Sequence, residues 1–335
     1  MATLADGETP AQLFRRAACM LEQPGTRILS LEVFGFEADD ESLKEGFGRV
    51  MWPVTQVQTD SPPGVQLSAV QGVEVEPIHD SGRIVGSSWA DENGRYCRLG
   101  DLRPADAGAD RAQQVRQTFE TMERILQAQG MSFAHVARTW FYIDRILDWY
   151  GQFNRCRDEF FSSRGVFDGL VPASTGVGGG NPSGAALTAT LLAVKPASME
   201  LTLTSVPSPL QCPALEYGSS FSRALEITSP GAQRLYVSGT ASIAPGELKF
   251  EHVGDVDAQI ERTVEVVEAI LQSRQVTWAQ VTRAIGYFKH LDDLPAYARA
   301  WERLGLPDLP ILLVQNDLCF DELLFELEVD AAIES

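Results

Sequence analysis

Hydrophobic residues in the C-terminal half of the chain recur at spacings that predict a defined order of strands and helices. Residues 221–227 and 234–243 alternate apolar and polar side chains, and Ser229-Pro230-Gly231 lies between them as a turn signal, so a β-hairpin is predicted. Residues 255–272 carry apolar side chains three and four positions apart, which predicts an amphipathic helix. The elements predicted after this helix are a strand over 281–288, a helix over 294–304 and closing strands over 311–314 and 323–329.

The chain also contains an internal repeat, which affects every later interpretation. Residues 117–142 align with residues 262–287 without a gap, and ten of the twenty-six positions are identical. Farther along, a second ungapped register sets Asn181 against Cys319 and Thr188 against Glu326. We therefore predict one module used twice. The expected domains are an N-terminal extension over 1–89 that partly forms sheet, a first module over 90–197 and a second over 198–335.

Within each module the predicted order is strand, strand, helix, strand, helix, strand. Helices packed on one face of mixed β-sheets give an α+β fold. In the N-terminal extension, residues 27–36 and 65–75 are strand-like and are expected to extend a sheet.

The composition of the chain argues against several classes of function. A net charge of −19 argues against nucleic acid or an anionic membrane as partner, because binding to phosphates depends on clustered Lys and Arg. Five cysteines without a CxxC pair suggest free thiols in a reducing cytoplasm. The first twenty residues show no secretory signal, and the longest nearly apolar stretch, 185–194, is half the length of a membrane span. We expect a cytoplasmic protein.

Neither a metal nor a cofactor is predicted. The four histidines are scattered without a pair at ligand spacing. The glycine-rich run over 176–184 precedes a strand and no helix follows it, so the geometry that holds a phosphate is missing. No GxSxG motif is present.

The last strand combines apolar and acidic positions. Strict alternation places Phe325, Leu327 and Val329 on one face, which should pack on helices, and Glu326 and Glu328 on the other. Glu326 therefore lies on an interior or interface face, whereas its counterpart in the repeat is a threonine. The pattern alone also fits a strand carboxylate that faces solvent.

These segments carry a family resemblance. The repeated unit, followed by a proline-led strand and the sequence LLFELEVDA, resembles the RidA/YjgF fold. Two such units, together with PASTGVGG at 172–179 and the stretch over 217–224, resemble the chorismatases, which split chorismate into pyruvate and a cyclic acid. The resemblance covers about residues 80–335. It implies chorismate as the small-molecule substrate, and a monomer or a homotrimer.

The chemistry implied by the resemblance needs an acid. Cleavage of the enolpyruvyl ether begins with protonation of its vinyl CH2 carbon, a poor base, so a neutral carboxylic acid with a pKa raised by burial is required. Glu326 is the expected catalytic acid, and Glu328, nearer the strand end, is the weaker candidate.

Cys319 is the second expected catalytic residue. In the chorismatase resemblance a cysteine seven residues before the glutamate marks enzymes that form 3-hydroxybenzoate, where a thiol would assist opening of an epoxide-like ring intermediate. Formation of 4-hydroxybenzoate as well is a close variant. A buried small hydrophobe is the structural alternative for such a cysteine.

The remaining site residues are expected to bind the substrate. Arginine guanidinium groups can bind the two substrate carboxylates through paired hydrogen bonds, and tyrosine hydroxyls can hydrogen-bond its hydroxyl or carboxylate. Small strand residues allow the ligand to come close to backbone N–H groups. The arginines and tyrosines would otherwise belong to solvated helix faces or to the core. The expected substrate-binding residues are Arg157, Arg223, Tyr217, Tyr150, Gly239, Thr240, Ala241 and Arg155.

Three alternative functions remain open from the sequence. One is hydrolysis of chorismate to a dihydroxycyclohexadiene carboxylate. Another is RidA-like imine deamination, but the arginine that this activity uses after the conserved proline is absent behind both Pro172 and Pro310. The last is a non-catalytic ligand-binding module.

Overall fold

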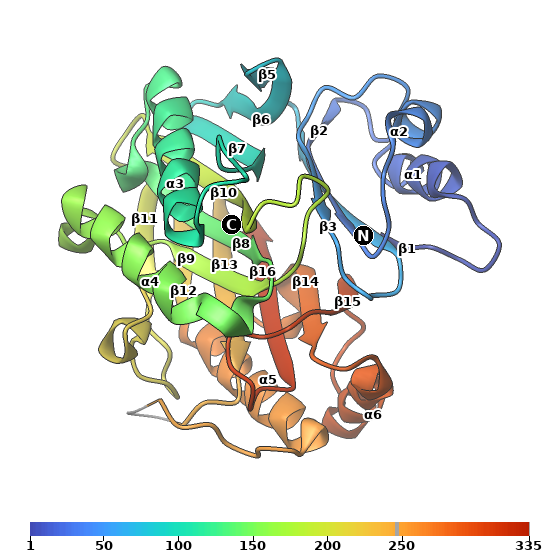
Figure 1. Ribbon diagram of the computed structural model, residues 1–335, viewed down its shortest axis with the longest axis vertical. Helices are drawn as coiled ribbons and strands as arrows, with labels where there is room; N and C mark the ends of the chain where they lie inside the picture. The colour runs from blue at the N-terminus through green and yellow to red at the C-terminus, as the bar shows by residue number, and fades with distance from the viewer. Residues whose placement is uncertain (245–247, 335) are drawn as a thin grey trace.

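The structure is a computed structural model that describes residues 1–244 and 248–334. Three β-sheets pack around a shared centre, and helices cover their outer faces (Figure 1). Among the described residues, no helix has both the length and the apolar character needed to cross a membrane.

The N-terminal part forms a sheet of its own, with strand order β1-β4-β2-β3, and does not extend a neighbouring sheet as expected. Its elements are β1 Ala2–Thr3, α1 Pro10–Cys19, β2 Thr26–Phe34, α2 Asp40–Phe47, β3 Val54–Val57 and β4 Gly64–Gln71.

The first module forms a six-stranded sheet with order β5-β6-β7-β10-β8-β9. Its elements are β5 Val75–Asp80, β6 Arg83–Ala90, β7 Gly94–Leu102, α3 Arg111–Ala128, β8 Val136–Ile143, α4 Ile146–Ser163, β9 Ala173–Gly178 and β10 Leu187–Pro196. The strands β5 and β6 precede residue 90, so the sheet begins earlier than the boundary proposed from the repeat.

The second module repeats this arrangement with order β11-β12-β13-β16-β14-β15. Its elements are β11 Thr202–Val206, β12 Ala224–Ser229, β13 Ala232–Ala241, α5 Val256–Ser273, β14 Val281–Phe288, α6 Leu294–Leu304, β15 Ile311–Gln315 and β16 Phe325–Glu334. The predicted hairpin is formed by β12 and β13, and Gly231 closes it with a φ of +78° that favours glycine.

Identical strand order and matching register confirm the predicted duplication. Tyr142 of β8 pairs with Thr188 of β10, and its aligned counterpart Tyr287 of β14 pairs with Glu326 of β16. Thr188 and Glu326 therefore occupy equivalent positions in the two sheets. The α+β class with tandem modules is confirmed as well.

The N-terminal sheet repeats part of the same topology. Strands β1-β4-β2-β3 have the order and directions of β7-β10-β8-β9, with β2 and β3 parallel as β8 and β9 are. Helices α1 and α2 occupy the chain positions of α3 and α4. The N-terminal part is thus a shorter third copy that lacks the first hairpin.

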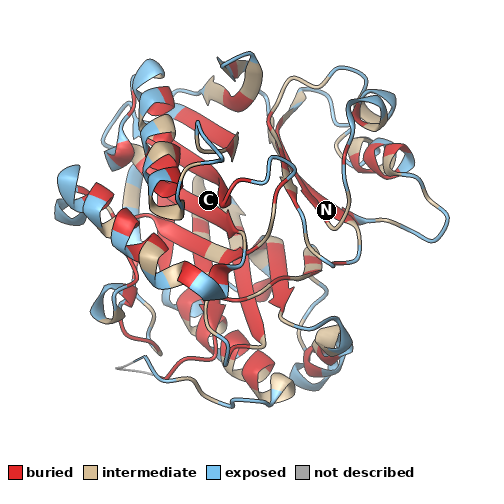
Figure 2. Cartoon of the chain, in the orientation of Figure 1, coloured by how far each residue is buried: buried red, intermediate tan, exposed pale blue. Residues whose placement is uncertain are grey.

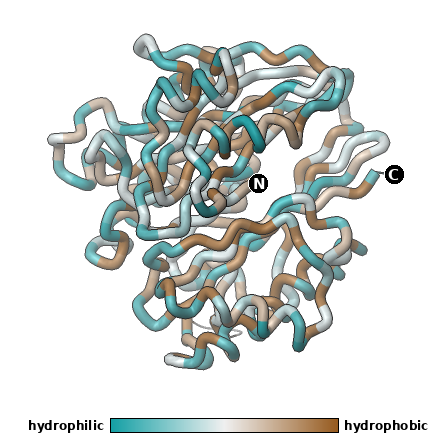
Figure 3. The backbone as a smooth tube through the Cα atoms, turned by 90° about the vertical axis from the view of Figure 1, so that its right-hand side faces the viewer, coloured by the Kyte–Doolittle hydropathy of each residue, from teal (hydrophilic) through white to brown (hydrophobic). Residues whose placement is uncertain are grey.

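The cores follow from the alternation of the strands. Phe325, Leu327 and Val329 pack with α5 residues such as Ile260 and Val264, as predicted. The opposite faces of all three sheets meet in a central cluster (Figure 2). Hydrophobic stretches run along these interior strands, while many outer turns are hydrophilic (Figure 3). The acidic face of β16 therefore points into the centre of the molecule.

Candidate active site

Glu326 lies where the two six-stranded sheets face each other, near the start of β16. Only 5% of the residue is exposed. Within the described ranges, neither of its carboxyl oxygens has a hydrogen-bond partner. Gly239 of β13 lies against it, and a Cβ at this glycine would overlap the carboxyl group. Gly239 therefore makes the space that Glu326 occupies.

The environment of Glu326 favours the neutral acid. Burial, and to a smaller extent the nearby negative charge of Glu328, raise its pKa to about 8, although Arg138 and Arg223 act in the opposite direction. A carboxyl group with this pKa is largely protonated at neutral pH. The strand thus presents a proton donor inside the protein.

Glu328, two residues along the same face, is in the opposite state. It is fully buried, and Arg138 of β8 donates to it at 2.7 Å while Arg283 of β14 forms a second ion pair. Trp140 Nε1 donates at 3.1 Å, and Tyr287 donates at 3.2 Å. Burial would raise the pKa of Glu328, but Arg283 and Arg138 outweigh it and lower the pKa. Glu328 is therefore a fixed, ionised carboxylate and a poor acid.

An open pocket lies between the two modules. Glu326 does not line it, but the lining residues Tyr150 and Cys319 lie near enough to Glu326 for its charge to affect their pKa values. The pocket contains about 1340 Å³ of empty space, including its mouth, and it is formed by α4, the segment around η3 (Ala214–Tyr217) and the loop before β16. Four of the expected site residues line it, namely Tyr150, Arg155, Tyr217 and Cys319.

Arg157 and Arg223 are buried next to residues that line this pocket. Arg157 donates to Asn154 Oδ1 at 2.7 Å, and its buried Nε has no partner among the described residues. Arg223 donates to the Cys212 carbonyl at 3.0 and 2.9 Å and lies 5.3 Å from the centre of the Tyr217 ring. Neither guanidinium is within ion-pair distance of a carboxylate in the described chain. Two uncompensated cations are suited to a ligand with two carboxylates.

The same neighbouring groups, Glu326 and Arg157, affect the pKa values of Tyr150 and Cys319. Burial raises the pKa of Tyr150 to about 12, with contributions from Cys319 and, in the opposite direction, from Arg157. Burial and the neighbouring Glu326 raise the pKa of the Cys319 thiol well above its usual range. The structure thus brings Glu326, Cys319, Tyr150 and Arg157 together, and their hydroxyl and thiol groups stay protonated at neutral pH.

Three expected residues differ from their predicted roles. The Gly239 N–H donates to Thr175 Oγ1 at 2.9 Å, and the Thr240 hydroxyl donates to the Ser238 carbonyl, so neither group is free for a ligand. The Ala241 carbonyl accepts from Gln211. The small side chains of these strand positions suggested a ligand contact, but their polar groups are bonded within the protein, that of Gly239 to the first module and those of Thr240 and Ala241 to their own module. Arg155 is exposed on α4 at the pocket rim.

Sequence reasoning missed the residues that hold Glu328. Arg138 and Arg283 are aligned and identical in the repeat, and this identity could have singled them out. Thr175, within the PASTGVGG segment, hydrogen-bonds Glu328, Arg138 and Gly239. Asn154 and Ser219 also line the pocket, and no pattern in the sequence distinguished them.

Comparisons with known proteins agree with this architecture. Residues 79–193 match the family model described as chorismatase FkbO/Hyg5-like, N-terminal. A 3-hydroxybenzoate synthase of Streptomyces hygroscopicus is 23% identical over 331 residues, covering 91% of each chain. A chorismatase of Streptomyces rapamycinicus is 27% identical over 220 residues, covering 59% of this chain and 64% of the relative.

A solved structure shares the whole fold. The crystal structure of a chorismatase superposes with a TM-score of 0.71 at 20% identity and covers 93% of this chain and 94% of its own. The matched sequences show similarity to chorismatases over most of this chain, and the solved chorismatase structure shows the same fold.

Proposed function

We propose that this chain is an enzyme that protonates the enolpyruvyl group of chorismate through Glu326 and releases pyruvate. The observation that carries the proposal is a buried carboxyl group with a pKa of about 8 beside a pocket between the modules. General acid catalysis is efficient when the pKa of the acid lies near the working pH, and it contributes roughly 10²–10⁴ in rate. The names of the similar proteins support the same substrate.

Arg157 and Arg223 are proposed to hold the two substrate carboxylates. Each is almost fully buried, and neither has an acidic partner in the part of the chain that the structure describes. In a chain with a net charge of −19, such cations attract a dianion locally although the protein as a whole repels it. Tyr150 and Tyr217 would donate their protonated hydroxyls to the same ligand.

The proposed reaction starts with transfer of the Glu326 proton to the vinyl CH2 carbon, which becomes the methyl group of pyruvate. The resulting oxocarbenium ion makes the ether oxygen a good leaving group. In the intramolecular route, the neighbouring ring hydroxyl oxygen displaces it, the ring–ether bond breaks and pyruvate leaves with the ether oxygen. The released hydroxyl proton restores Glu326.

Cys319 is proposed to direct the ring product toward 3-hydroxybenzoate. Opening of the epoxide-like intermediate and loss of a ring proton give this aromatic acid, so chorismate is converted to two products without net uptake of water. Because its pKa is raised, the thiol would act as a hydrogen-bond donor to the ring oxygen and not as a thiolate nucleophile. The same geometry permits some 4-hydroxybenzoate.

The proposal is tested by incubating the purified chain with chorismate in D2O and measuring pyruvate and the ring acids by chromatography and mass spectrometry. We expect pyruvate with one deuterium in its methyl group, together with 3-hydroxybenzoate. Glu326→Gln should remove both products, while Glu302→Gln, an exposed exchange of the same kind on α6, should leave them unchanged. Absence of pyruvate in the unaltered chain would refute the proposal.

A further inference from the structure

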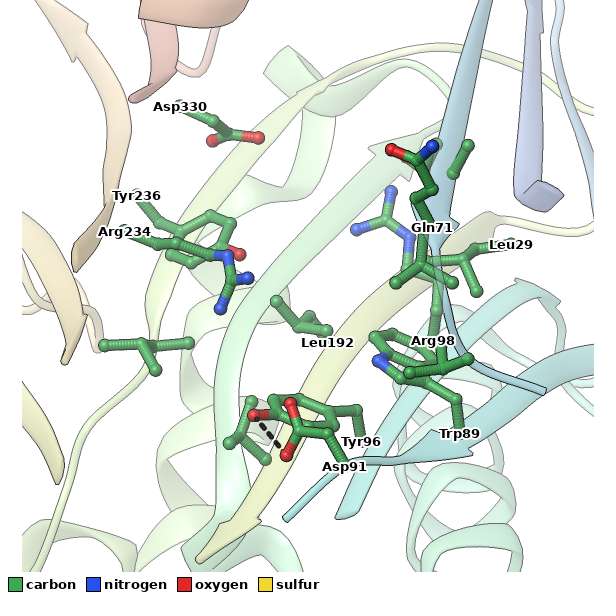
Figure 4. A pocket seen from close by; sticks show the side chains of 16 residues that line it. Leu29, Gln71, Trp89, Asp91, Tyr96, Arg98, Leu192, Arg234, Tyr236 and Asp330 are labelled. Atoms are coloured by element: carbon green, nitrogen blue, oxygen red, sulfur yellow. Dashed lines mark hydrogen bonds between the residues drawn. The ribbon is translucent and has the colours of Figure 1, made fainter. Parts of the chain in front are cut away.

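A second pocket lies farther along β16, where the N-terminal sheet meets both modules (Figure 4). It has about 980 Å³ of empty space, including its opening. Arg234 and Tyr236 of β13 and Asp330 of β16 line one side of it, and Trp89 and Tyr96 of the first module line another. None of these residues takes part in the proposed reaction.

Arg234 is an uncompensated cation in this pocket. Among the described residues, no carboxylate lies within ion-pair distance of its guanidinium, and no hydrogen bond to it is found. The other arginine of the pocket, Arg98, is neutralised by Glu32 at 2.9 Å. The planar N–H donors of Arg234 are therefore available for a carboxylate, which a guanidinium binds through two parallel hydrogen bonds.

Asp330 offers a hydrogen-bond acceptor on the same wall. Its Oδ2 accepts from Arg283 at 3.4 Å, but its Oδ1 is buried and has no partner within the described chain. A buried acceptor without a partner is costly, and a ligand hydroxyl would satisfy it. Asp330 pairs directly with Tyr236 across the two strands, and Arg234 lies two residues from Tyr236 on the same face.

The spacing of these groups limits the size of the ligand. Arg234 and Asp330 are diagonal cross-strand neighbours, for which the Cα separation is about 7–8 Å. Both side chains line the same pocket, so a six-membered ring that carries a carboxylate and a hydroxyl on different sides is small enough to contact both. The pocket also contains Asp91, but its Oδ1 already accepts hydrogen bonds from the Tyr96 hydroxyl and from the Asn93 and Gly94 N–H groups. A single uncompensated cation beside these carboxylates favours a monocarboxylate over a dianion or a phosphate.

The rest of the pocket is suited to the faces of such a ring. Leu192 forms a buried apolar part of the wall, and Trp89 stacks on Tyr96 with ring centres 5.3 Å apart and an interplanar angle of 8°. Figure 4 shows these side chains around the same space as Arg234. Aromatic and aliphatic walls with a few convergent polar groups are typical of small-molecule sites.

We propose that this pocket is a second ligand site for a hydroxylated aromatic monocarboxylic acid, with Arg234 binding the carboxylate and Asp330 accepting the hydroxyl hydrogen bond. The site is separate from the candidate active site and does not depend on turnover of chorismate.

The test is calorimetric titration of the full chain with 3-hydroxybenzoate. We expect Arg234→Met to weaken binding at this site by at least about tenfold, since a charge-assisted bidentate contact is lost. Arg95→Met is the control, because Arg95 lies on β7, the strand of the first module that corresponds to β13, and its side chain bonds the Gln129 carbonyl and does not line the pocket. Arg157→Met removes binding at the candidate active site and should leave the second site intact.

Chemical variants of the probe sharpen the assignment. Benzoate, which lacks the hydroxyl, should bind several-fold more weakly than 3-hydroxybenzoate, and phenol, which lacks the carboxylate, should bind more weakly still. Binding should quench a fluorescence signal that disappears in Trp89→Phe. These expectations hold whether or not the chain acts on chorismate.

The proposal is overturned if folded Arg234→Met binds 3-hydroxybenzoate as the unaltered chain does, or if Arg157→Met abolishes all binding. If Arg234→Met does not fold, Arg234→Gln is judged by the same tenfold criterion. Tyr236→Phe, which keeps the wall and the charge, should retain the site in either case.

Discussion

The last strands of the two modules, β10 and β16, have the same place in equivalent sheets and opposite character. In β10 the inward positions are Thr188, Thr190 and Leu192, and in β16 they are Glu326, Glu328 and Asp330. The threonine strand has only short polar groups, and the Thr190 hydroxyl has no partner among the described residues. The acidic strand contains the proposed proton donor and its ionised neighbour.

The difference shows how a duplicated fold can build one site from two copies. Arg138 and Arg283 are equivalent residues of the repeat, yet both bind Glu328 of the second module. The first module has the arginine but carries Thr190 at the position of the Glu328 carboxylate. It also supplies α4 with Arg157 and Tyr150, while the second supplies the acid. The proposed mechanism therefore uses one site per pair of modules.

The largest effect is expected at the proton donor. Glu326→Gln should lower kcat by about 10²–10⁴, whereas Thr188→Val at the equivalent position should leave kcat nearly unchanged. In the unaltered chain, kcat should fall as the pH rises through about 8, because the protonated form with its raised pKa is lost. A pH profile of pyruvate release checks both statements, and a profile flat through pH 8 would contradict the role of Glu326.

The raised pKa of Glu326 also predicts a change in stability. The folded state retains a proton that the unfolded state loses above its ordinary pKa of about 4.5, so the free energy of unfolding should decrease as the pH rises from about 4.5 to 8. Each unit of the shift corresponds to about 1.4 kcal/mol. Denaturant titrations at several pH values should show a weaker decrease for Glu326→Gln than for the unaltered chain.

The next largest effect concerns the ionised neighbour. Glu328→Gln leaves Arg138 and Arg283 buried without their carboxylate, and removal of one partner of a buried ion pair costs about 3–5 kcal/mol. The matched exchange Thr190→Val in β10 should change the free energy of unfolding by less than about 1 kcal/mol, because that hydroxyl has no partner to lose. Urea unfolding of both variants measures the two changes in the free energy of unfolding. Equal losses of stability would contradict the expected difference.

A smaller effect is expected at Gly239 of β13, and Gly100 of β7 provides the comparison. Gly239→Ala places a Cβ in the space of the Glu326 carboxyl and should cost about 1–3 kcal/mol of stability together with most of the activity. Gly100→Ala places its Cβ 3.0 Å from the Thr55 hydroxyl and 3.1 Å from Pro53 Cβ, a less severe overlap than at Gly239 and one far from Glu326. Its effect on kcat should be minor. A Gly239→Ala variant with unaltered kcat would show that the carboxyl position is not critical.

The smallest effect on rate is expected at Cys319. Cys319→Ala should retain pyruvate release within about tenfold and shift the ring product from 3-hydroxybenzoate toward the dihydroxycyclohexadiene acid. Cys156→Ala, which removes a buried thiol of α4 outside the pocket, is the control and should leave the product ratio unchanged. Chromatography of the ring acids measures the product ratio. An unaltered ratio in Cys319→Ala would contradict the proposal that Cys319 directs the ring product.

Much of the second module could be predicted because its apolar periodicity is strong. The helix over Leu294–Leu304 and the strand over Val281–Phe288 match the predicted ranges, and α5 differs by one residue at each end. The strand β11 was missed because Thr202–Val206 is a mostly exposed edge strand without apolar alternation. The third copy in the N-terminal part was missed because only its topology, and not its sequence, retains the repeat.

The site was partly predictable for a similar reason. Alternation along one strand identified the inward face of Glu326 and Glu328, which are close in the sequence. The state of Glu328 depends on Arg138, which is 190 residues away, and on Thr175 in another strand. The sequence contains no pattern that pairs such distant residues, so the contrast between a neutral and an ionised carboxyl required the folded structure.

Because both modules that form the candidate site belong to one chain, dilution of the protein does not separate them. The residues of α4 and β16 belong to the same polypeptide, so their encounter is intramolecular and their effective concentration is set by the chain between them. A site assembled from separate subunits loses its walls as the subunits dissociate. Here the proposed proton donor, Glu326 of the second module, and Arg157 of the first module remain together at any dilution of the protein.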